Sequence, residues 1–173
     1  MAATFVVEDG SGKSDANAYV SVADADQYNE DHNADTTWDG LSDAEKEKYI
    51  RLATQYLDMK YGRRWIGVRS NEDQALDWPR TGAVDRDGYT LDSDALPQDL
   101  VDACVESAIK YAGGEDLLGD LDNPGIVKKT RSKVGELEDE IEYMGGNTPY
   151  KRYRVIEAII ASITSGTNTL ERS

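Results

Sequence analysis

The stretch from Ser42 to Gly62 constrains the fold of this chain more than any other segment. Ser42 is followed three residues later by Glu45, the capping-box pattern that opens a helix, and Gly62 is typical of a helix end. Between them apolar residues recur at spacings of three and four, which places them on one helix face. These residues are Tyr49, Ile50, Leu52, Ala53, Tyr56, Leu57 and Tyr61. The pattern predicts a long amphipathic helix against which the rest of the chain packs.

A second amphipathic helix is predicted to begin just after Ser93 or Asp94, with Pro97 near its first turn, where a missing N–H is tolerated. Its apolar residues keep helical spacing until Gly113-Gly114, a pair that favours a helix end. A weaker capping box, Ser21 with Asp24, opens a shorter predicted helix that runs to about His32. A last helix is indicated near the C-terminus by isoleucines at helical spacing. They are Ile156, Ile159, Ile160 and Ile163.

The stretches between these helices lack helical periodicity. Residues 33–40 and 63–96 are predicted to be loops, rich in turn-forming residues. Residues 128–134 and 138–144 flank Gly135 and favour a two-stranded β-hairpin. The predicted fold class is therefore mainly α, a small bundle of three to four helices with one β-hairpin and long ordered loops.

The length of 173 residues is enough for one domain with a real core, without a disulfide or metal staple. We expect residues 1–163 to form a single helical domain. Residues 164–173 are polar and are expected to form a flexible C-terminal tail.

The chain is strongly acidic, with 34 Asp and Glu against 19 Lys and Arg and a formal net charge of −15. This balance argues against a general nucleic-acid binder, which neutralises phosphates with Lys and Arg. No apolar run approaches the roughly 20 residues of a membrane span, so no membrane partner is expected. Cys104 is the only cysteine, which excludes an internal disulfide and a cysteine-based zinc site. We expect an acidic globular protein of a reducing compartment.

The most suggestive chemical motif is the run Gly10 to Ser14, Gly-Ser-Gly-Lys-Ser, which follows a β-like segment. A phosphate-binding loop needs a further glycine five residues before Gly12, and that position is Val7. Glu8 and Asp9 would also repel a triphosphate. We therefore interpret the run as a turn.

Other candidate sites are equally weak. The Asp-rich runs 85–88 and 120–123 lack the twelfth-position glutamate of a calcium loop and are predicted to be ordinary turns. His32, the only histidine, is expected at a solvated helix end, and Cys104 is expected in the core. We predict no catalytic residue, no cofactor and no metal site, and the protein is not expected to be an enzyme.

Two segments interleave arginine with tryptophan, Arg63-Arg64-Trp65 and Trp78-Pro79-Arg80. In one interpretation the rings stack the bases of single-stranded DNA. In the other, the tryptophans anchor an ordered loop onto the helices while the arginines pair outward. The second is favoured because the acidic surroundings would repel a DNA strand.

Four segments resemble a family of tailed-phage proteins commonly described as DnaT-like single-stranded-DNA-binding proteins. The chain as a whole is similar to the head–tail connector, or adaptor, proteins of tailed phages. The most specific element is Trp-Pro-Arg-Thr-Gly, which ends the last of the four segments. The segments are Glu8–Gly12, Ala16–Ala25, Ala53–Asp58 and Gln74–Gly82.

The adaptor resemblance implies a virion structural protein in the phage neck, made in the host cytoplasm and assembled as a ring, usually a dodecamer, under the portal. Its implied partners are further copies of itself, the portal protein, a tail or neck completion protein, and genomic DNA that passes through the channel without specific binding. The resemblance implies portal contacts at Ile163, Thr164, Thr169, Leu170 and Arg172. It implies contacts with neighbouring subunits or the DNA channel at Arg63, Arg64, Trp65, Arg69, Trp78 and Arg80.

Three functions therefore stay open at this point. The adaptor is favoured because a negatively charged channel lacks the counterion-release attraction that would hold DNA in place. The alternative is a single-stranded-DNA-binding accessory protein of replication, as the family description says. A nucleotide-dependent enzyme rests only on Gly12-Lys13-Ser14.

Overall fold

The computed structural model describes residues 4–118, 127–131, 140–143 and 153–165. The chain divides into two compact units, one made of residues 1–117 with 154–173 and the other of residues 118–153. The boundary predicted between a domain ending at residue 163 and a flexible tail stays a prediction, because residues 166–173 lie outside the described part.

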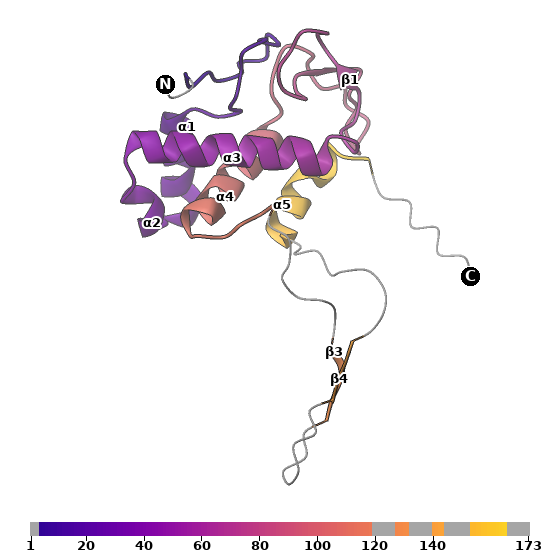
Figure 1. Cartoon of the computed structure of the whole chain (residues 1–173). Helices are drawn as coiled ribbons and strands as arrows, with labels where there is room; N and C mark the ends of the chain where they lie inside the picture. The colour runs from indigo at the N-terminus through magenta and orange to yellow at the C-terminus, as the bar shows by residue number, and fades with distance from the viewer. Residues whose placement is uncertain (1–3, 119–126, 132–139, 144–152, 166–173) are drawn as a thin grey trace, which may run out of the picture. The chain divides into compact units, whose positions relative to one another are not determined.

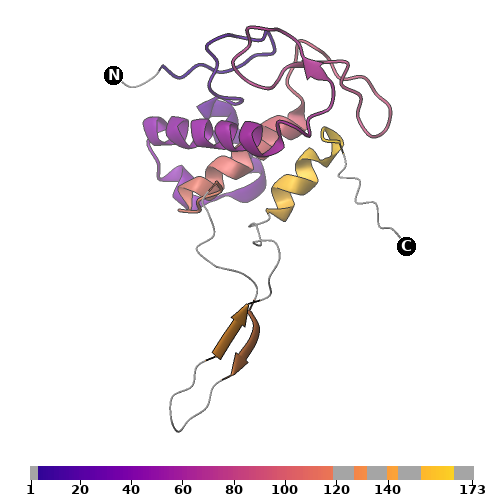
Figure 2. The same cartoon turned by 45° about the vertical axis from the view of Figure 1, so that its right-hand side comes forward.

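The larger unit is helical (Figure 1). Its two longest helices, α3 and α4, pack against each other in both views (Figures 1 and 2). The described helices of this unit are α1 Val22–Tyr28, a π-helix Asn29–Asn33, α2 Thr36–Asp39, α3 Asp43–Tyr61, α4 Gln98–Ala112, α5 Arg154–Ile159 and a 3-10 helix Ile160–Ser162.

Helix α3 begins and ends where the sequence predicts. The Ser42 N–H donates to Glu45 Oε2 at 2.9 Å as part of a complete capping box, and Gly62 is the C-cap. The predicted apolar face is largely buried, although Tyr49 and Leu52 are only half-buried. Its fully buried members include Ile50, Ala53, Tyr56, Leu57 and Tyr61. This face supplies one side of the core.

Helix α4 supplies the other side of the core. Pro97 is its N-cap, and Cys104 is fully buried at the contact with α3, where its Sγ lies 3.5 Å from Thr54 Oγ1. Burial raises the pKa of the Cys104 thiol to about 12. The expected core position of Cys104 is confirmed. Further buried residues of α4 are Leu100, Ala103, Val105, Ser107, Ala108 and Ile109.

The segment before α3 differs from the prediction of a loop over residues 33–40. Helix α2 forms there because the Asp35 side chain accepts hydrogen bonds from the N–H groups of Thr37 and Trp38. Trp38 is fully buried and donates its indole N–H to Asp26 Oδ1 at 2.8 Å, and Lys46 of α3 pairs with the same oxygen at 2.8 Å. A short capped helix therefore places one tryptophan in the core.

The loop region after α3 contains a small β layer. Strands β1 Val68–Arg69 and β2 Arg80–Thr81 are antiparallel, and Val84 and Thr90 form a further antiparallel bridge. The Trp78–Pro79 peptide bond, just before β2, is cis. The layer lies at the C-terminal end of α3 (Figures 1 and 2).

The smaller unit contains the predicted hairpin. Strands β3 Val127–Arg131 and β4 Glu140–Tyr143 are antiparallel, with Thr130 opposite Ile141 and Arg131 opposite Glu140. The predicted fold class, mainly α with one such hairpin, is confirmed. In the described part of the chain no helix has the length and apolarity to cross a membrane.

Candidate functional site

The glycine-rich run after Val7 has the backbone of an anion-binding loop, and the chain fills it with its own carboxylate. Glu8 Oε1 accepts hydrogen bonds from the N–H groups of Gly10 and Gly12, both at 2.9 Å, and of Asp9 at 3.1 Å. Glu8 Oε2 accepts from Lys13 N–H at 2.8 Å. Glu8 is only 2% exposed. These N–H groups are unavailable to a phosphate, which confirms that the run is a turn.

Lys13 is also occupied within its own loop. Its ammonium donates to the Val7 carbonyl and pairs with Asp9 Oδ2, both at 2.8 Å. The hydrogen bond and charge of Lys13 hold the pKa of the Asp9 carboxyl well below its usual range. Gly10 cannot be replaced freely, because a Cβ on it would lie 2.0 Å from the Asp94 carbonyl oxygen.

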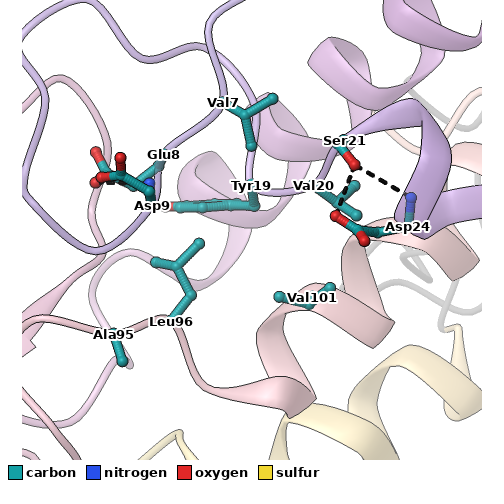
Figure 3. A pocket seen from close by; sticks show the side chains of 10 residues that line it. All are labelled: Val7, Glu8, Asp9, Tyr19, Val20, Ser21, Asp24, Ala95, Leu96 and Val101. Atoms are coloured by element: carbon teal, nitrogen blue, oxygen red, sulfur yellow. Dashed lines mark hydrogen bonds between the residues drawn. The ribbon is translucent and has the colours of Figure 1, made fainter.

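A pocket of about 350 Å³ opens beside this turn (Figure 3). Its walls are mostly apolar, and the polar side chains that line it already have partners within the chain. Ser21 Oγ donates to Asp24 Oδ2 at 2.6 Å and accepts from the Asp24 N–H at 3.1 Å. The apolar lining residues are Val7, Val20, Ala95, Leu96 and Val101. The lining of the pocket does not point to a particular ligand.

The predicted turn over residues 85–88 is confirmed. Asp85 Oδ1 accepts the N–H groups of Asp87 at 2.9 Å and Tyr89 at 2.8 Å, so its carboxylate closes the turn. Residues 120–123 lie outside the described part of the chain. In the described ranges no group of three or more His, Cys, Asp or Glu side chains is arranged to hold a metal ion.

His32 lies at the exposed end of the π-helix, as predicted. Its ring stacks on Tyr28 with centroids 4.2 Å apart, and its Nδ1 lies 3.1 Å from the Tyr28 carbonyl oxygen. These contacts are local to one helical turn.

The two tryptophans of the Arg–Trp segments are buried, as the favoured interpretation predicts. Trp78 is fully buried, Trp65 is 5% exposed, and their rings meet edge to face with centroids 6.1 Å apart. Tyr61 of α3 extends this cluster, with its ring centroid 5.8 Å from that of Trp65. The tryptophans therefore anchor the loop onto α3 and are not available to stack a base.

Arg80 turns inward, and here the expectation of outward-pairing arginines is wrong. Its guanidinium donates to the backbone carbonyls of Ile66 at 2.7 Å, Gly67 at 2.8 Å and Asp77 at 3.1 Å. These carbonyls come from the two sides of the β layer, and a guanidinium carries enough N–H donors to reach all three. Arg80 holds the layer together and is 9% exposed.

Asp58 joins the same region to the N-terminal turn. Its carboxylate accepts from the Tyr19 hydroxyl at 2.5 Å and from the Asp77 N–H at 3.1 Å. The Tyr19 hydroxyl oxygen in turn accepts the N–H of Trp78 at 3.3 Å. Burial, more than the nearby Asp77, raises the pKa of Asp58 to about 7.

The remaining arginines of this region stay on the surface. Arg63 is exposed and forms no ion pair within the described residues, while Arg64 is half-buried over the Tyr61 ring at 5.6 Å. Arg69 is exposed and donates from one nitrogen to the carbonyls of Glu72 and Gln74. They belong to the run from Met59 to Asn71, which carries four cations and no acidic residue; we call this run the basic segment.

The structure places two of the predicted portal contacts, Ile163 and Thr164, beside the predicted subunit-contact segment. Ile163 is buried, its carbonyl accepts the Ile66 N–H at 3.2 Å, and Thr164 forms an antiparallel bridge with Trp65. The N–H of Ser165 donates to the Arg64 carbonyl at 2.6 Å. Ile163 and Thr164 therefore pair with the basic segment. The other predicted portal contacts, Thr169, Leu170 and Arg172, lie outside the described residues.

Comparison with known proteins gives one result. A family described as "Putative DnaT-like ssDNA binding protein" matches residues 3–172. The chain belongs to this family. No curated protein and no solved structure matches the chain significantly.

This match corrects the predicted function. The hypothesis of a non-enzymatic head–tail adaptor in the virion neck is wrong, because the family is described by binding of single-stranded DNA. The same finding overturns the ring under the portal, the portal and tail partners, and DNA that passes without binding. The net charge of −15 argued against DNA binding, but it does not describe the acid-free basic segment.

Proposed function

We propose that this protein binds single-stranded DNA, and that it acts by binding without catalysing a reaction. The observation that carries the proposal is the family match over nearly the whole chain, residues 3–172. The exposed arginines of the basic segment support a location for the contact.

The basic segment is the location that fits DNA phosphates. Arg63 and Arg69 are exposed there, and Arg63 has no carboxylate partner among the described side chains. An arginine fork recognises phosphate oxygens through two parallel N–H donors, so these side chains can position a backbone without reading its sequence.

Charge disfavours a strand along the segment from Val22 to Glu47. Residues 22–47 contain nine acidic residues and one lysine, and that lysine, Lys46, is buried against Asp26. A polyanion is repelled from such a face, whose field extends about 10 Å at ordinary ionic strength. Binding is therefore expected to be local and to weaken steeply as salt is added.

The proposal is tested by fluorescence anisotropy with a labelled single-stranded thymidine oligonucleotide, titrated with the full chain at several salt concentrations. The logarithm of the association constant is expected to fall linearly with the logarithm of salt, by roughly 0.7 for each phosphate contact. Arg63→Ala and Arg69→Ala are each expected to weaken binding and to remove about one contact from the slope.

Lys48→Ala is the matched control, because Lys48 is an exposed cation on α3 outside the basic segment. It removes the same charge and is expected to leave affinity and slope nearly unchanged. Absence of binding by the unmodified protein at low salt would overturn the proposal. Equal effects of Lys48→Ala and Arg63→Ala would show that the contact lies elsewhere.

A further inference from the structure

Tyr89 is the most exposed of the large apolar side chains in the described residues, with 72% of its surface open to solvent. A single exposed aromatic ring is common in folded proteins and carries no meaning by itself. Tyr89 differs in two respects: hydrogen bonds fix the turn that carries it, and that turn is attached to the β layer that contains Arg69.

The backbone around Tyr89 is fixed by hydrogen bonds at both of its polar groups. Its N–H donates to Asp85 Oδ1 at 2.8 Å, and its carbonyl accepts the Asp85 N–H at 2.9 Å. Gly88, just before it, has a φ of +91° and donates its N–H to the Asp85 carbonyl at 3.1 Å. The closed turn holds the ring outward in advance of any contact, which lowers the entropy lost when a ligand binds.

The turn is attached to the same β layer as the basic segment. Val84 and Thr90 form a bridge, and the Leu91 N–H donates to the Ala83 carbonyl at 2.9 Å, directly after β2. Strand β1, the partner of β2, contains Arg69 and the 65% exposed Val68. One hydrogen-bonded layer thus carries the Tyr89 ring, the Val68 side chain and Arg69, a candidate phosphate ligand.

Charge decides which part of a nucleotide suits the turn. Asp85 and Asp87 lie in it, and Arg86 pairs with Asp87 at a distance of 3.9 Å. Two carboxylates against one arginine disfavour a phosphate at this place, whereas an uncharged base is not repelled. The phosphates are then expected to follow the arginines of the basic segment while a base reaches the ring.

We propose that Tyr89 is a base-stacking residue: an unpaired base of the strand held at Arg63 and Arg69 stacks on its ring. This inference rests on the proposed binding of single-stranded DNA and names the group that contacts the bases. Stacking of this kind tolerates any base, because every base has a flat π face.

The experiment compares two oligonucleotides with the same number of phosphates, one of thymidines and one with abasic tetrahydrofuran units in place of the nucleosides. The unmodified protein is expected to bind the thymidine strand about tenfold more tightly than the abasic strand. Tyr89→Ala is expected to weaken binding of the thymidine strand about tenfold and to leave the abasic strand nearly unaffected. Tyr89→Phe keeps the ring and is expected to keep the discrimination.

Val155→Ala serves as the control, because Val155 is another exposed apolar side chain, at the start of α5. It is expected to leave both affinities unchanged, and urea unfolding of each variant verifies that the fold is intact. Binding of both strands with equal affinity, or an unchanged ratio in Tyr89→Ala, overturns the stacking inference and leaves the proposed function standing. Failure of the unmodified protein to bind either strand overturns both.

Discussion

Two loops of this molecule are each held by one buried side chain, and the two side chains carry opposite charges. In the turn after Val7, the Glu8 carboxylate accepts hydrogen bonds from four backbone N–H groups. In the β layer, the Arg80 guanidinium donates to three backbone carbonyls. Each charge replaces the secondary-structure partners that an irregular loop lacks.

The two loops differ in whether the cations beside them stay exposed to a ligand. Around Glu8 the nearest cation, Lys13, is consumed by Asp9 and the Val7 carbonyl. Around Arg80 the outer arginines Arg63 and Arg69 remain exposed. In both loops the sequence offers a cation that could meet a phosphate, Lys13 in one and Arg80 in the other. In the structure each of them donates to one or more backbone carbonyls instead. Of these two loops, only the second has exposed arginines in or beside it.

Arg80→Ala is expected to have the largest effect on this comparison. It strips three carbonyls of a charged donor and removes a buried side-chain stem, so the free energy of unfolding should fall by about 4 kcal/mol. Urea unfolding followed by tryptophan fluorescence measures the change, since Trp65 and Trp78 lie in this region. Arg80→Lys keeps the charge without the fork and should recover only part of the loss. A loss below about 1 kcal/mol would mean that the guanidinium does not hold the layer.

The second prediction concerns Asp58, which connects the two loops through Tyr19 and Asp77. Because burial raises its pKa from 3.8 to about 7, the folded protein retains a proton that the unfolded chain releases at lower pH. From pH about 4 to about 7 this group should therefore lower the free energy of unfolding by about 3 kcal/mol as pH rises.

The check is urea unfolding across that pH range for the unmodified protein and for Asp58→Asn. The variant cannot ionise and can still accept the Asp77 N–H, so the difference between the two curves isolates this carboxyl. Asp15→Asn, at an exposed position, is the control and should follow the unmodified protein. Parallel curves for Asp58→Asn and the unmodified protein would contradict the prediction.

Glu8→Gln should have an intermediate effect. One of the two acceptor oxygens becomes an NH2 group that faces backbone donors, so a loss of about 2 kcal/mol in unfolding free energy is expected. The neighbouring Asp9→Asn changes the same charge at an exposed ion pair and should destabilise the fold much less than Glu8→Gln. Similar losses in both variants would show that net charge, and not the buried hydrogen bonds, stabilises the turn.

Asp85→Ala should give the smallest change, because Asp85 is half-buried and holds two N–H groups where Glu8 holds four. A loss of about 0.5–1 kcal/mol is expected, together with faster hydrogen exchange at the Tyr89 amide. Asp87→Ala, which removes an exposed carboxylate from the same turn, should leave that exchange rate unchanged. Unaltered exchange in Asp85→Ala would mean that the turn keeps Tyr89 in place without its carboxylate.

Local signals made the long helices predictable. Helix α3 has both its capping box and its buried face in contiguous sequence, and Pro97 with Gly113 brackets α4 in the same way. Helix α2 was not predicted: its Asp35 cap is local, but the burial of Trp38 against Asp26, twelve residues earlier in the chain, appears only in the folded structure. Its four residues are too few to show a helical period.

The candidate site was predictable only in part. The burial of Trp65 and Trp78 was predicted correctly, but acidic surroundings do not explain it at Trp65, which lies in the acid-free basic segment. The direction of Arg80 does not follow from the sequence, because its acceptors, the Ile66 and Gly67 carbonyls, are brought to it only by the folded layer. The absence of acidic residues from Met59 to Asn71 was countable in the sequence, whereas the exposure of Tyr89 required the structure.

The placement of Cys104 has a practical consequence. Its thiol lies between α3 and α4 with a pKa raised to about 12, so at neutral pH it is both covered and protonated. A maleimide reagent should then leave it untouched while the helices stay together. A cysteine introduced at an exposed position can thus carry a dye alone. The rate at which the native thiol is modified then reports how often the two longest helices separate.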